Sequence, residues 1–380
     1  MTSWKTYKLG DILNFRRGHD LPKTDMVNGE IPVAGSNGII GSHNVSTPIE
    51  PCITIGRSGN VGTPYIYDKC WAHNTVLYVD DFKGNDPLYL YYLLKTIPLA
   101  SYGGGSAVPT LNRNHIHPIE IKHTPSLEEQ RRIAGILGAI DDKIENNRRI
   151  NTNLELQAQA LYKQWFVDFE FPNEEGKPYK SSGGKMVDSE LGLIPKGWSV
   201  GALSDLADIT MGQSPNGKSF NENGEGIVFY QGRTEFGIRY PSIRLYTTEP
   251  TRYAEPMSVL LSVRAPVGDI NIATQRCCIG RGVASIKSKT DDNAYMYCCL
   301  KELRPQLDQY NGEGTVFGSI NRKELEGLAL CIPQNEVISQ FNNLVLGMDR
   351  QMLNLFQQTQ NLTTLRDTLL PKLMNGEIKL

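Results

Sequence analysis

The sequence predicts an α+β fold in which two similar mixed domains are separated by two long helices that form an antiparallel coiled coil. Two observations support this prediction: one long stretch has coiled-coil spacing, and the second half of the chain repeats the landmarks of the first half in the same order. The 380 residues are 39% hydrophobic and 21% charged, which is an ordinary globular composition. A chain of this size can form two domains with connecting helices.

The stretch 127–166 carries apolar residues at alternating four-three spacing, which is typical of the a/d seam of a coiled coil. Asn147 and Asn151 lie in this seam. A buried asparagine at such a position lowers stability but fixes the register, so we expect a specific helical partner.

The second half of the chain repeats the first half. The matched landmarks are, in order, Trp4 and Trp198, Gly18 and Gly212, Arg57 and Arg264, Tyr89 and Tyr295, and Pro125 and Pro333. The same order of landmarks in both halves indicates that one structural unit is duplicated, which gives an internal pseudo-twofold repeat.

The long helix is repeated as well. When the seam positions of 127–166 are transferred to the second half, they fall almost entirely on apolar residues between Phe341 and Leu373. We expect the two helices to pair with each other; the alternative is that each packs only on its own domain. The predicted helix-pairing residues are Ile133, Leu137, Ile140, Ile144, Leu154, Leu161, Phe341, Val345, Met348, Met352, Leu355, Leu362 and Leu369.

These landmarks divide the chain into five segments. They are a first mixed domain (1–125), a first spacer helix (126–170), a linker (171–194), a second mixed domain (195–333) and a C-terminal spacer helix (334–380). The linker is rich in Gly, Pro, Ser and Lys and is predicted to be an ordered-to-flexible connector.

Within the mixed domains, short elements of both kinds are expected. Apolar runs at 75–79 and 227–230 predict strands. The stretches 87–96 and 293–302 are predicted to form single helices.

Composition limits the class of protein. The net charge of −2 indicates no basic arm, so any contact with DNA must come from local patches or from a partner subunit. Seven cysteines without a CxxC motif, and no signal-like run after Met1, predict a reduced, cytoplasmic protein. No uncharged apolar stretch approaches the roughly 18–20 residues of a membrane span, so no membrane association is expected.

The stretch 212–219 matches the phosphate-binding pattern GxxxxGK[ST]. That pattern binds phosphate only where a helix follows it. The polar stretch 220–226 is a poor helix start, so we do not predict a nucleotide site, although a P-loop NTPase remains an alternative.

Two further clusters could suggest catalysis or metal binding. Asp168, Glu175 and Lys177 resemble a nuclease pattern, but they lie in a charge-rich linker and are predicted to be solvated. The three histidines His115, His117 and His123 could share one face of a strand, but the matched positions in the second copy include glutamates. We predict a solvent-facing edge, no metal site and no catalytic residue in this chain.

Polar loops at matched positions remain as binding candidates. Arginine can read guanine, and asparagine or glutamine can read adenine, through paired hydrogen bonds. The predicted DNA-binding residues are Ser36, Asn37, Arg57, Ser58, Asn60, His73, Asn74, Gly104, Ser106, Gln231, Arg233, Thr234, Arg264, Arg281, Tyr310 and Thr315.

Three motifs carry a resemblance to a known family. They are PSLEEQRRI at 125–133, WFVDF at 165–169 and GLIPKGW at 192–198. On these motifs and on the duplicated architecture, the chain resembles the specificity subunits of type I restriction-modification systems over nearly its whole length.

The resemblance implies that 1–125 and 195–333 are target-recognition domains, each reading one half of a bipartite, asymmetric site in double-stranded DNA. The chain would be a non-catalytic subunit of a type I restriction endonuclease and adenine-N6 DNA methyltransferase complex. Its implied partners are two methyltransferase (modification) subunits, which use S-adenosylmethionine, and restriction/translocase subunits, which use ATP and Mg. The alternative is a free-standing, two-headed DNA-binding regulator.

Overall fold

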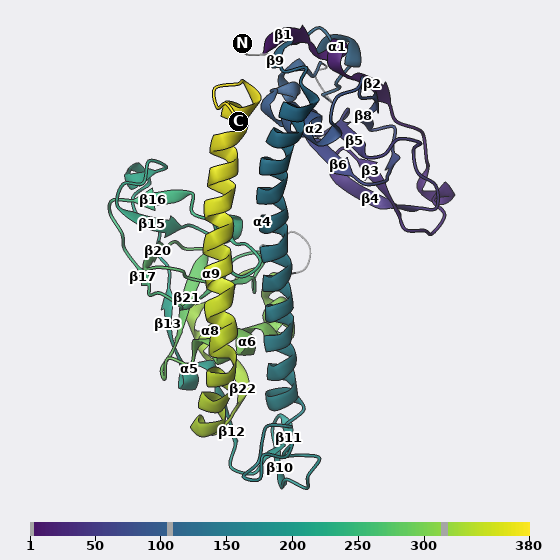
Figure 1. Ribbon diagram of the computed structural model, residues 1–380. Helices are drawn as coiled ribbons and strands as arrows, with labels where there is room; N and C mark the ends of the chain where they lie inside the picture. Colours follow the sequence, from purple (N-terminus) through teal and green to yellow (C-terminus); the bar gives the residue numbers. More distant parts are fainter. Residues whose placement is uncertain (1–3, 105–108, 313–317) are drawn as a thin grey trace. The chain divides into compact units, whose positions relative to one another are not determined.

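The computed structural model describes residues 4–104, 109–312 and 318–380. The chain forms two compact units, each containing one mixed domain and parts of two long helices (Figure 1). Unit 1 comprises Met1–Asn146 and Gln358–Leu380, and unit 2 comprises Asn147–Gln357.

The mixed domain of unit 1 consists of short strands, short helices and 3₁₀ turns. Its elements are β1 (Lys5–Lys8), α1 (Leu9–Ile12), β2 (Asn14–Arg17), η1 (Lys23–Asp25), β3 (Ile31–Gly35), β4 (Gly38–His43), β5 (Cys52–Gly56), β6 (Pro64–Tyr67), β7 (Trp71–Ala72), β8 (Val76–Asp81), α2 (Pro87–Thr96), η2 (Leu99–Tyr102), α3 (Arg113–Ile116) and β9 (Glu120–His123).

Three sheets organise this domain. A four-stranded antiparallel sheet has the order β2-β8-β5-β6, a second sheet has the order β4-β3-β7, and β1 pairs with β9. The strand β3 runs parallel to β7. Because β5 is buried along its whole length, it forms the centre of the core.

The mixed domain of unit 2 follows a connector. The elements are the π-helical turn η3 (Lys163–Val167), β10 (Met186–Ser189), β11 (Gly192–Pro195), β12 (Ser199–Ala202), α5 (Leu203–Leu206), β13 (Ala207–Met211), η4 (Gly217–Ser219), β14 (Phe220–Asn221), β15 (Ile227–Tyr230), η5 (Arg233–Glu235), β16 (Leu245–Thr247), β17 (Tyr253–Ala254), β18 (Val259–Ser262), β19 (Ile270–Ile272), β20 (Cys277–Ile279), β21 (Val283–Ser288), α6 (Asn293–Glu302), α7 (Arg304–Asp308), η6 (Gln309–Asn311), α8 (Arg322–Glu326) and β22 (Ala329–Ile332).

The sheets of unit 2 repeat those of unit 1. The order β13-β21-β18-β19 corresponds to β2-β8-β5-β6, and the pair β12-β22 corresponds to β1-β9. In the five-stranded sheet β14-β16-β15-β20-β17, β15 runs parallel to β20, as β3 runs parallel to β7. The internal repeat predicted from the sequence is therefore present in the topology.

The predicted short elements are confirmed. The helices α2 and α6 and the strand β15 have the predicted bounds, and β8 begins one residue after the other predicted strand and ends two residues beyond it. Helix α2 begins where it does because the Asp86 side chain accepts a hydrogen bond from the Tyr89 amide at 2.9 Å, with Pro87 in the first turn.

Two long helices complete the fold. They are α4 (Leu127–Tyr162) and α9 (Asn335–Met374), and each unit contains a segment of both. In unit 2, Tyr162 packs on Phe341, whereas Glu155, earlier in α4, shares Arg239 with Asp349, later in α9. These contacts run antiparallel. The α+β class with two similar domains and two long antiparallel helices is thus confirmed.

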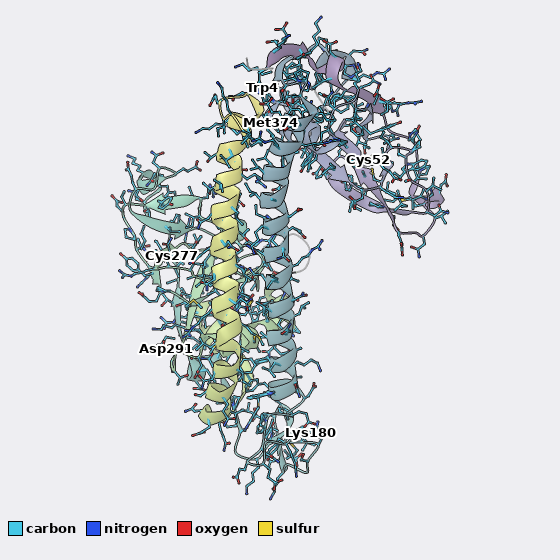
Figure 2. All side chains as sticks on the ribbon, viewed as in Figure 1. Trp4, Cys52, Lys180, Cys277, Asp291 and Met374 are labelled. Atoms are coloured by element: carbon cyan, nitrogen blue, oxygen red, sulfur yellow. The ribbon has the colours of Figure 1, made fainter. Side chains whose placement is uncertain are left out.

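The predicted helix-pairing residues are all buried or half-buried. In unit 1, Ile133 and Leu137 share a hydrophobic core with Leu373 and Met374. Figure 2 shows Met374 beside Trp4 at one end of this unit. In the seam, Asn147 is fully buried and Asn151 is half-buried.

The connector between α4 and the second mixed domain is ordered by aromatic packing within unit 2. The ring of Phe171 stacks on Tyr179 at 4.6 Å and on Trp198 at 5.0 Å between centroids. The strands β10 and β11 form an antiparallel hairpin. Two ion pairs, Lys163–Asp168 and Lys177–Glu175, lie exposed on this region.

The predicted solvent-facing histidine edge is wrong for two of the three residues. His123 lies in β9 opposite Lys5, is 2% exposed, and packs 5.2 Å from the Tyr7 ring. Burial lowers the pKa of His123 to about 4. His117 is half-buried and its Nε2 accepts a hydrogen bond from the Phe15 amide at 3.1 Å, so it is structural, whereas His115 is exposed in α3.

The stretch that matches a phosphate-binding loop is not followed by a helix. Gly217–Ser219 form a single 3₁₀ turn, and Phe220–Asn221 form β14. Among the described residues, no group of three His, Cys, Asp or Glu side chains is placed to hold a metal ion. None of the described helices is long and apolar enough to cross a bilayer.

All seven cysteines are free thiols, and six of them are buried. Cys52 of β5 and Cys277 of β20, labelled in Figure 2, are fully buried. Burial raises the pKa of Cys277 to about 12, which keeps this thiol protonated.

Candidate nucleic-acid interface

In unit 1, several predicted binding residues meet where three chain segments end. Ser36, after β3, donates its hydroxyl to the Thr75 carbonyl at 2.6 Å, and the Arg57 amide, after β5, donates to the same carbonyl at 2.8 Å. The His73 Nδ1 lies 3.0 Å from the Thr75 hydroxyl. Thr75 therefore ties the ends of β3 and β5 to the turn before β8.

The turn after β5 is held from its other side. The Leu111 amide donates to the Arg57 carbonyl at 2.7 Å, and Ser58 forms a bridge with Thr110. The Gly104 amide also donates a hydrogen bond to the Thr110 carbonyl at 2.9 Å. The fold thus gathers Gly104 and the Arg57 turn on one rim.

The other predicted residues of unit 1 surround this rim. Asn37 and Asn60 are exposed, and the Asn74 side chain donates to Asp20. Ser106 lies outside the described residues.

A basic depression opens beside the rim, with a volume of about 390 Å³. Its lining residues are Arg16, Arg17, Arg57, Leu77, Thr110, Leu111, Asn112 and Arg113. No acidic residue is among them. Four guanidinium groups around one concave surface attract a polyanion and offer paired donors to phosphate or to a guanine edge.

Contacts within the depression position its arginines. Arg113 donates from Nη1 to the Phe15 carbonyl at 3.2 Å, which brings α3 against β2. Arg57 donates from Nη1 to the Asn74 carbonyl at 3.4 Å. Because carbonyls leave the charge of both side chains uncompensated, the depression stays positive.

Sequence reasoning identified Arg57 and missed the other three arginines. A signal was present, since Arg16 and Arg17 directly precede Gly18, one of the repeat landmarks. Arg113 likewise follows an asparagine that recurs in the second copy.

In unit 2, the matched strand ends also meet. The Val263 amide donates to the Gly282 carbonyl at 3.0 Å, and the Gly282 amide donates to the Gln231 carbonyl at 3.2 Å. This network brings Gln231 and Arg281 next to the end of β18. Arg264 then pairs with Ser319 in a bridge, as Ser58 pairs with Thr110 in unit 1.

Arg264, Gln231 and Arg281 are exposed, and within the described residues Arg264 forms no ion pair. Tyr310 is half-buried and packs against the main hydrophobic core of the unit. Thr315 lies outside the described residues.

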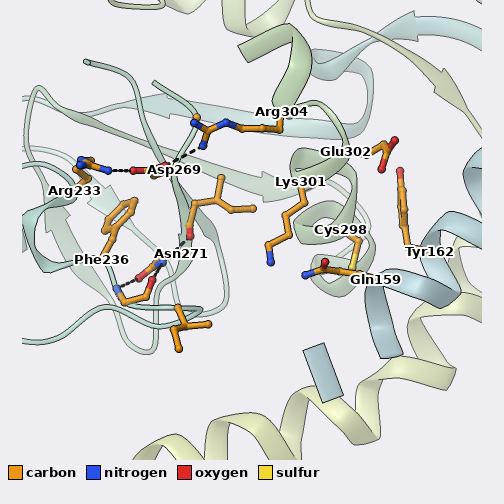
Figure 3. Close-up of a pocket in the computed structure, with 14 residues that line it drawn as sticks. Gln159, Tyr162, Arg233, Phe236, Asp269, Asn271, Cys298, Lys301, Glu302 and Arg304 are labelled. Atoms are coloured by element: carbon orange, nitrogen blue, oxygen red, sulfur yellow. Dashed lines mark hydrogen bonds and ion pairs between the residues drawn. The ribbon is translucent and has the colours of Figure 1, made fainter. Parts of the chain in front are cut away.

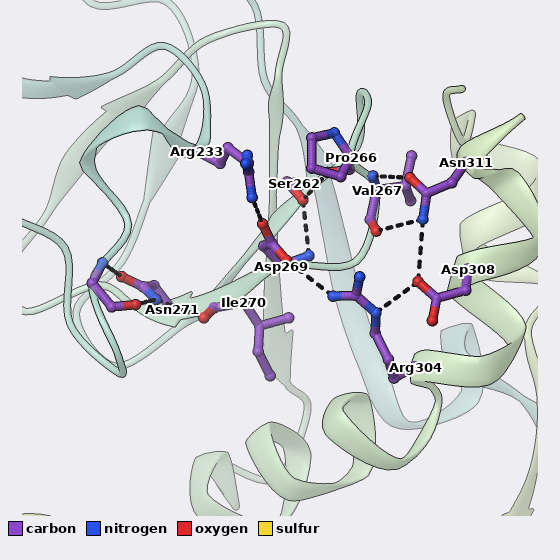
Figure 4. Close-up of polar contacts among 11 residues, drawn as sticks. Arg233, Ser262, Pro266, Val267, Asp269, Ile270, Asn271, Arg304, Asp308 and Asn311 are labelled. Carbon is purple, nitrogen blue, oxygen red and sulfur yellow. Dashed lines mark hydrogen bonds and ion pairs between the residues drawn. The ribbon is translucent and has the colours of Figure 1, made fainter. Parts of the chain in front are cut away.

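The contacts of Arg233 set it apart from these residues. It forms an ion pair with Asp269, which also accepts from Arg304 Nη1 at 2.9 Å (Figure 4). Burial opposes the charge of Asp269, but hydrogen bonds from Arg304 and Arg233 hold its pKa below the ordinary value. Arg233 is therefore largely neutralised, and Thr234 follows it as an exposed residue of η5.

Arg233 also lines a cavity of about 490 Å³. Figure 3 shows it with Phe236, Lys301 and Tyr162 around this space. Lys301 donates to Glu155 at 2.6 Å, so the cavity holds compensated charges and differs from the basic depression of unit 1.

Comparison with known proteins agrees with the duplicated architecture. The family model for the type I restriction modification DNA specificity domain matches residues 1–156 and 195–368. The chain belongs to this family. The two matched regions each contain one mixed domain and a segment of long helix.

Relatives from Methanocaldococcus jannaschii support the family assignment. The chain is 38% identical over 262 residues to the putative type I restriction enzyme MjaX specificity subunit, covering 66% of this chain and 58% of that relative. It is 30% identical over 313 residues to the type I restriction enzyme MjaIX specificity subunit, covering 77% of this chain and 69% of that relative.

A solved structure supports the fold. The S subunit of a type I restriction-modification system from M. genitalium is similar with a TM-score of 0.65 and 16% sequence identity. The match covers 98% of this chain and 96% of that one. The two relatives from M. jannaschii carry the name of specificity subunits.

Proposed function

We propose that this chain is the DNA sequence-recognition subunit of a type I restriction-modification complex and that it carries out no catalysis itself. The observation that supports this most strongly is the recurrence of one rim in both mixed domains. Each rim places an exposed or half-exposed arginine, Arg57 or Arg264, after the central strand of a matched sheet. Two such rims provide two DNA-reading surfaces on one chain.

The two rims carry different side chains at equivalent positions. The backbone hydrogen bonds match Arg57 and Ser58 of unit 1 with Val263 and Arg264 of unit 2, one position away from the match predicted from the sequence. Base edges are read by side chains, so different side chains on the same scaffold select different bases. The proposed DNA site is therefore bipartite and asymmetric.

The proposed partners supply the chemistry. Methyltransferase subunits, two in number, would modify adenine using S-adenosylmethionine, and restriction/translocase subunits would use ATP and Mg. With a net charge of −2, this chain brings little overall attraction for DNA. Basic surfaces of the partner subunits would complement the local patches.

Co-expression tests this function. The full chain is produced with its methyltransferase subunit, and methylated adenines are mapped across the genome by single-molecule sequencing. We expect methylation only when both are present, at one two-part motif. Methylation that ignores the presence of this chain would contradict the proposal.

The affinity for DNA distinguishes a specificity subunit from the alternative, a free-standing DNA-binding regulator. A specificity subunit should bind its site more tightly in complex with the methyltransferase, whereas a regulator should bind equally tightly alone. Gel-shift titration of one duplex carrying the mapped motif, with and without the methyltransferase, measures this difference.

A further inference from the structure

The segment 17–20 leads from the end of β2 along the rim of unit 1. The His19 amide donates to the Ala72 carbonyl at 2.8 Å, which holds this segment against the turn before β8. Asp20, the next residue, therefore lies beside Asn74 of that turn.

The carboxylate of Asp20 lies at the edge of the basic depression. The Asn74 side-chain amide donates to Asp20 Oδ1, and Arg17 Nη2 lies 3.7 Å from the same oxygen. The Asn74 carbonyl in turn accepts a hydrogen bond from Arg57 Nη1 at 3.4 Å. Asp20 is thus joined to two arginines that line the depression, to one directly and to the other through Asn74.

One oxygen of this carboxylate is left over. Both contacts are made by Oδ1, so Oδ2 has no hydrogen-bond partner among the described residues, and the Asp20 side chain is 75% exposed. Within the same part of the chain, no other carboxylate forms an ion pair with an arginine of the depression. DNA that enters the depression therefore meets an acceptor among guanidinium donors.

Unit 2 has the same backbone framework. The Gln213 amide donates to the Ile279 carbonyl at 3.0 Å, where His19 donates to Ala72 in unit 1. Ile279 ends β20 as Ala72 ends β7, and these two strands run parallel to the matched strands β15 and β3. The residues that follow can therefore be compared position by position.

The comparison shows that the fold does not require a charge at this position. Ser214 takes the place of Asp20, and Arg281 takes the place of Asn74. The Ser214 hydroxyl accepts a hydrogen bond from the Arg281 amide at 3.3 Å. Since a neutral hydroxyl is enough to hold the segment in unit 2, the negative charge of Asp20 serves another purpose.

We propose that Asp20 reads cytosine in the first half-site, the half contacted by the mixed domain of unit 1, by accepting a hydrogen bond from the cytosine N4 amino group at Oδ2. This inference rests on the proposed function. In the major groove guanine presents two acceptors, thymine an acceptor and a methyl group, and adenine an acceptor beside its donor, whereas cytosine presents a donor alone. An ionised carboxylate only accepts hydrogen bonds, so it is repelled by the acceptors of the other bases and selects cytosine.

The same charge opposes overall affinity for DNA. The phosphates repel a carboxylate, and Asp20 also compensates part of the positive charge of Arg17. Asp20 should therefore lower the affinity for DNA of any sequence while it raises the preference for its own base. These opposite effects distinguish base reading from a simple ion pair with Arg17.

The test uses Asp20→Asn, which removes the charge and preserves the size of the side chain. The matched control is Glu50→Gln, because Glu50 is also exposed and forms an ion pair, with Lys69 at 3.1 Å. Glu50 precedes β5, whereas Arg57 follows it. The five residues of that strand span about 16 Å, about twice the Debye length at physiological salt, so screening separates Glu50 from the rim.

Each full-length variant and the unmodified chain are purified with the methyltransferase subunit. Binding is measured to a library with both half-sites randomised and to a duplex that lacks the motif. Melting temperatures check that each variant is folded.

In Asp20→Asn, the preference for cytosine at one position of the first half-site should fall roughly 5- to 150-fold. The affinity for the duplex without the motif should rise, and the preference at the second half-site should stay the same. Glu50→Gln should change none of these three quantities.

Two results would overturn the inference. One is an Asp20→Asn complex that keeps the base preferences of the unmodified complex, whether or not its affinity rises, because Asp20 would then be only a counter-charge for Arg17. The other is an unmodified complex that selects a two-part motif without cytosine in the first half-site. Both results leave the proposed function standing. An unmodified complex with no sequence preference at all would contradict the proposed function, and this inference with it.

Discussion

Arg239→Met removes a guanidinium that is buried between the two long helices of unit 2. Arg239 is 6% exposed and forms ion pairs with Glu155 of α4 and with Asp349 of α9, the latter at 2.6 Å. Its guanidinium also lies 4.1 Å from the Tyr297 ring centre. The variant would leave Asp349 buried without its cation, whereas Glu155 keeps Lys301 at 2.6 Å.

The expected cost follows from these contacts. Breaking a buried ion pair by removing one partner costs about 3–5 kcal/mol, and loss of the aromatic contact adds to this. Burial already raises the pKa of Asp349 above its ordinary value, because Arg239 only partly offsets desolvation. In the variant that pKa rises further, so the loss of stability should be smaller at low pH, where Asp349 is protonated.

Urea unfolding at pH 7 and at pH 5 measures both effects. Arg322→Gln is the matched control, since Arg322 is 66% exposed and its ion pair should contribute less than about 1 kcal/mol. A loss below about 1 kcal/mol in Arg239→Met at pH 7 would refute the reasoning. The triple variant Glu155→Leu, Arg239→Met, Asp349→Leu should regain most of the lost stability, because it leaves neither carboxylate behind.

Three further perturbations test other parts of the structure. Ile140→Lys with Met348→Lys should lower the melting temperature and alter the gap between methylated half-sites, because both residues are half-buried in the helical seam; unchanged melting and gap would contradict the pairing. Between pH 6.5 and pH 4 the unfolded chain binds a proton at His123 that the folded chain excludes, so stability should fall by roughly 3 kcal/mol more in the unmodified protein than in His123→Phe. Equal pH profiles in urea unfolding would refute this. Lys218→Ala should leave melting and DNA binding unchanged, and ATP binding by calorimetry that is lost in this variant would revive the P-loop interpretation.

Elements with strong local signals could be predicted from the sequence. The bounds of α2 and α6 were predicted correctly, and the acidic residue and proline at the start of α2 explain where that helix begins. The internal repeat predicted the matching sheets, because landmark order in the sequence fixes strand order in the fold. These features depend on residues that are close in the chain or on a pattern that occurs twice.

The histidine error shows where such reasoning ends. The alternation of His115, His117 and His123 suggested one strand face, but the first is in α3, the second follows that helix, and only the third is in β9. The buried side of β9 is decided by its pairing with β1 and by Tyr89 of α2, which are distant in sequence. Local periodicity does not contain that information.

The binding surface could be predicted only in part, because it also depends on contacts between residues that are distant in the sequence. Arg57 was predicted because it follows an apolar run, as Arg264 does in the second half, although the structure matches Arg264 with Ser58. Arg16 and Arg17 line the same depression as Arg57 only because β2 pairs with β8. Their position beside Arg57 therefore could not be predicted before the sheet was known. Arg233 was expected on the surface, but its partner Asp269 lies in another turn that only the fold brings near.

The central claim is that each mixed domain reads one half of the DNA site. The most direct measurement replaces residues 1–125 with the corresponding domain of a related specificity subunit and maps methylated adenines after co-expression with the methyltransferase. We predict that one half of the motif changes and that the other half stays the same. A change in both halves, or in neither, would contradict the claim.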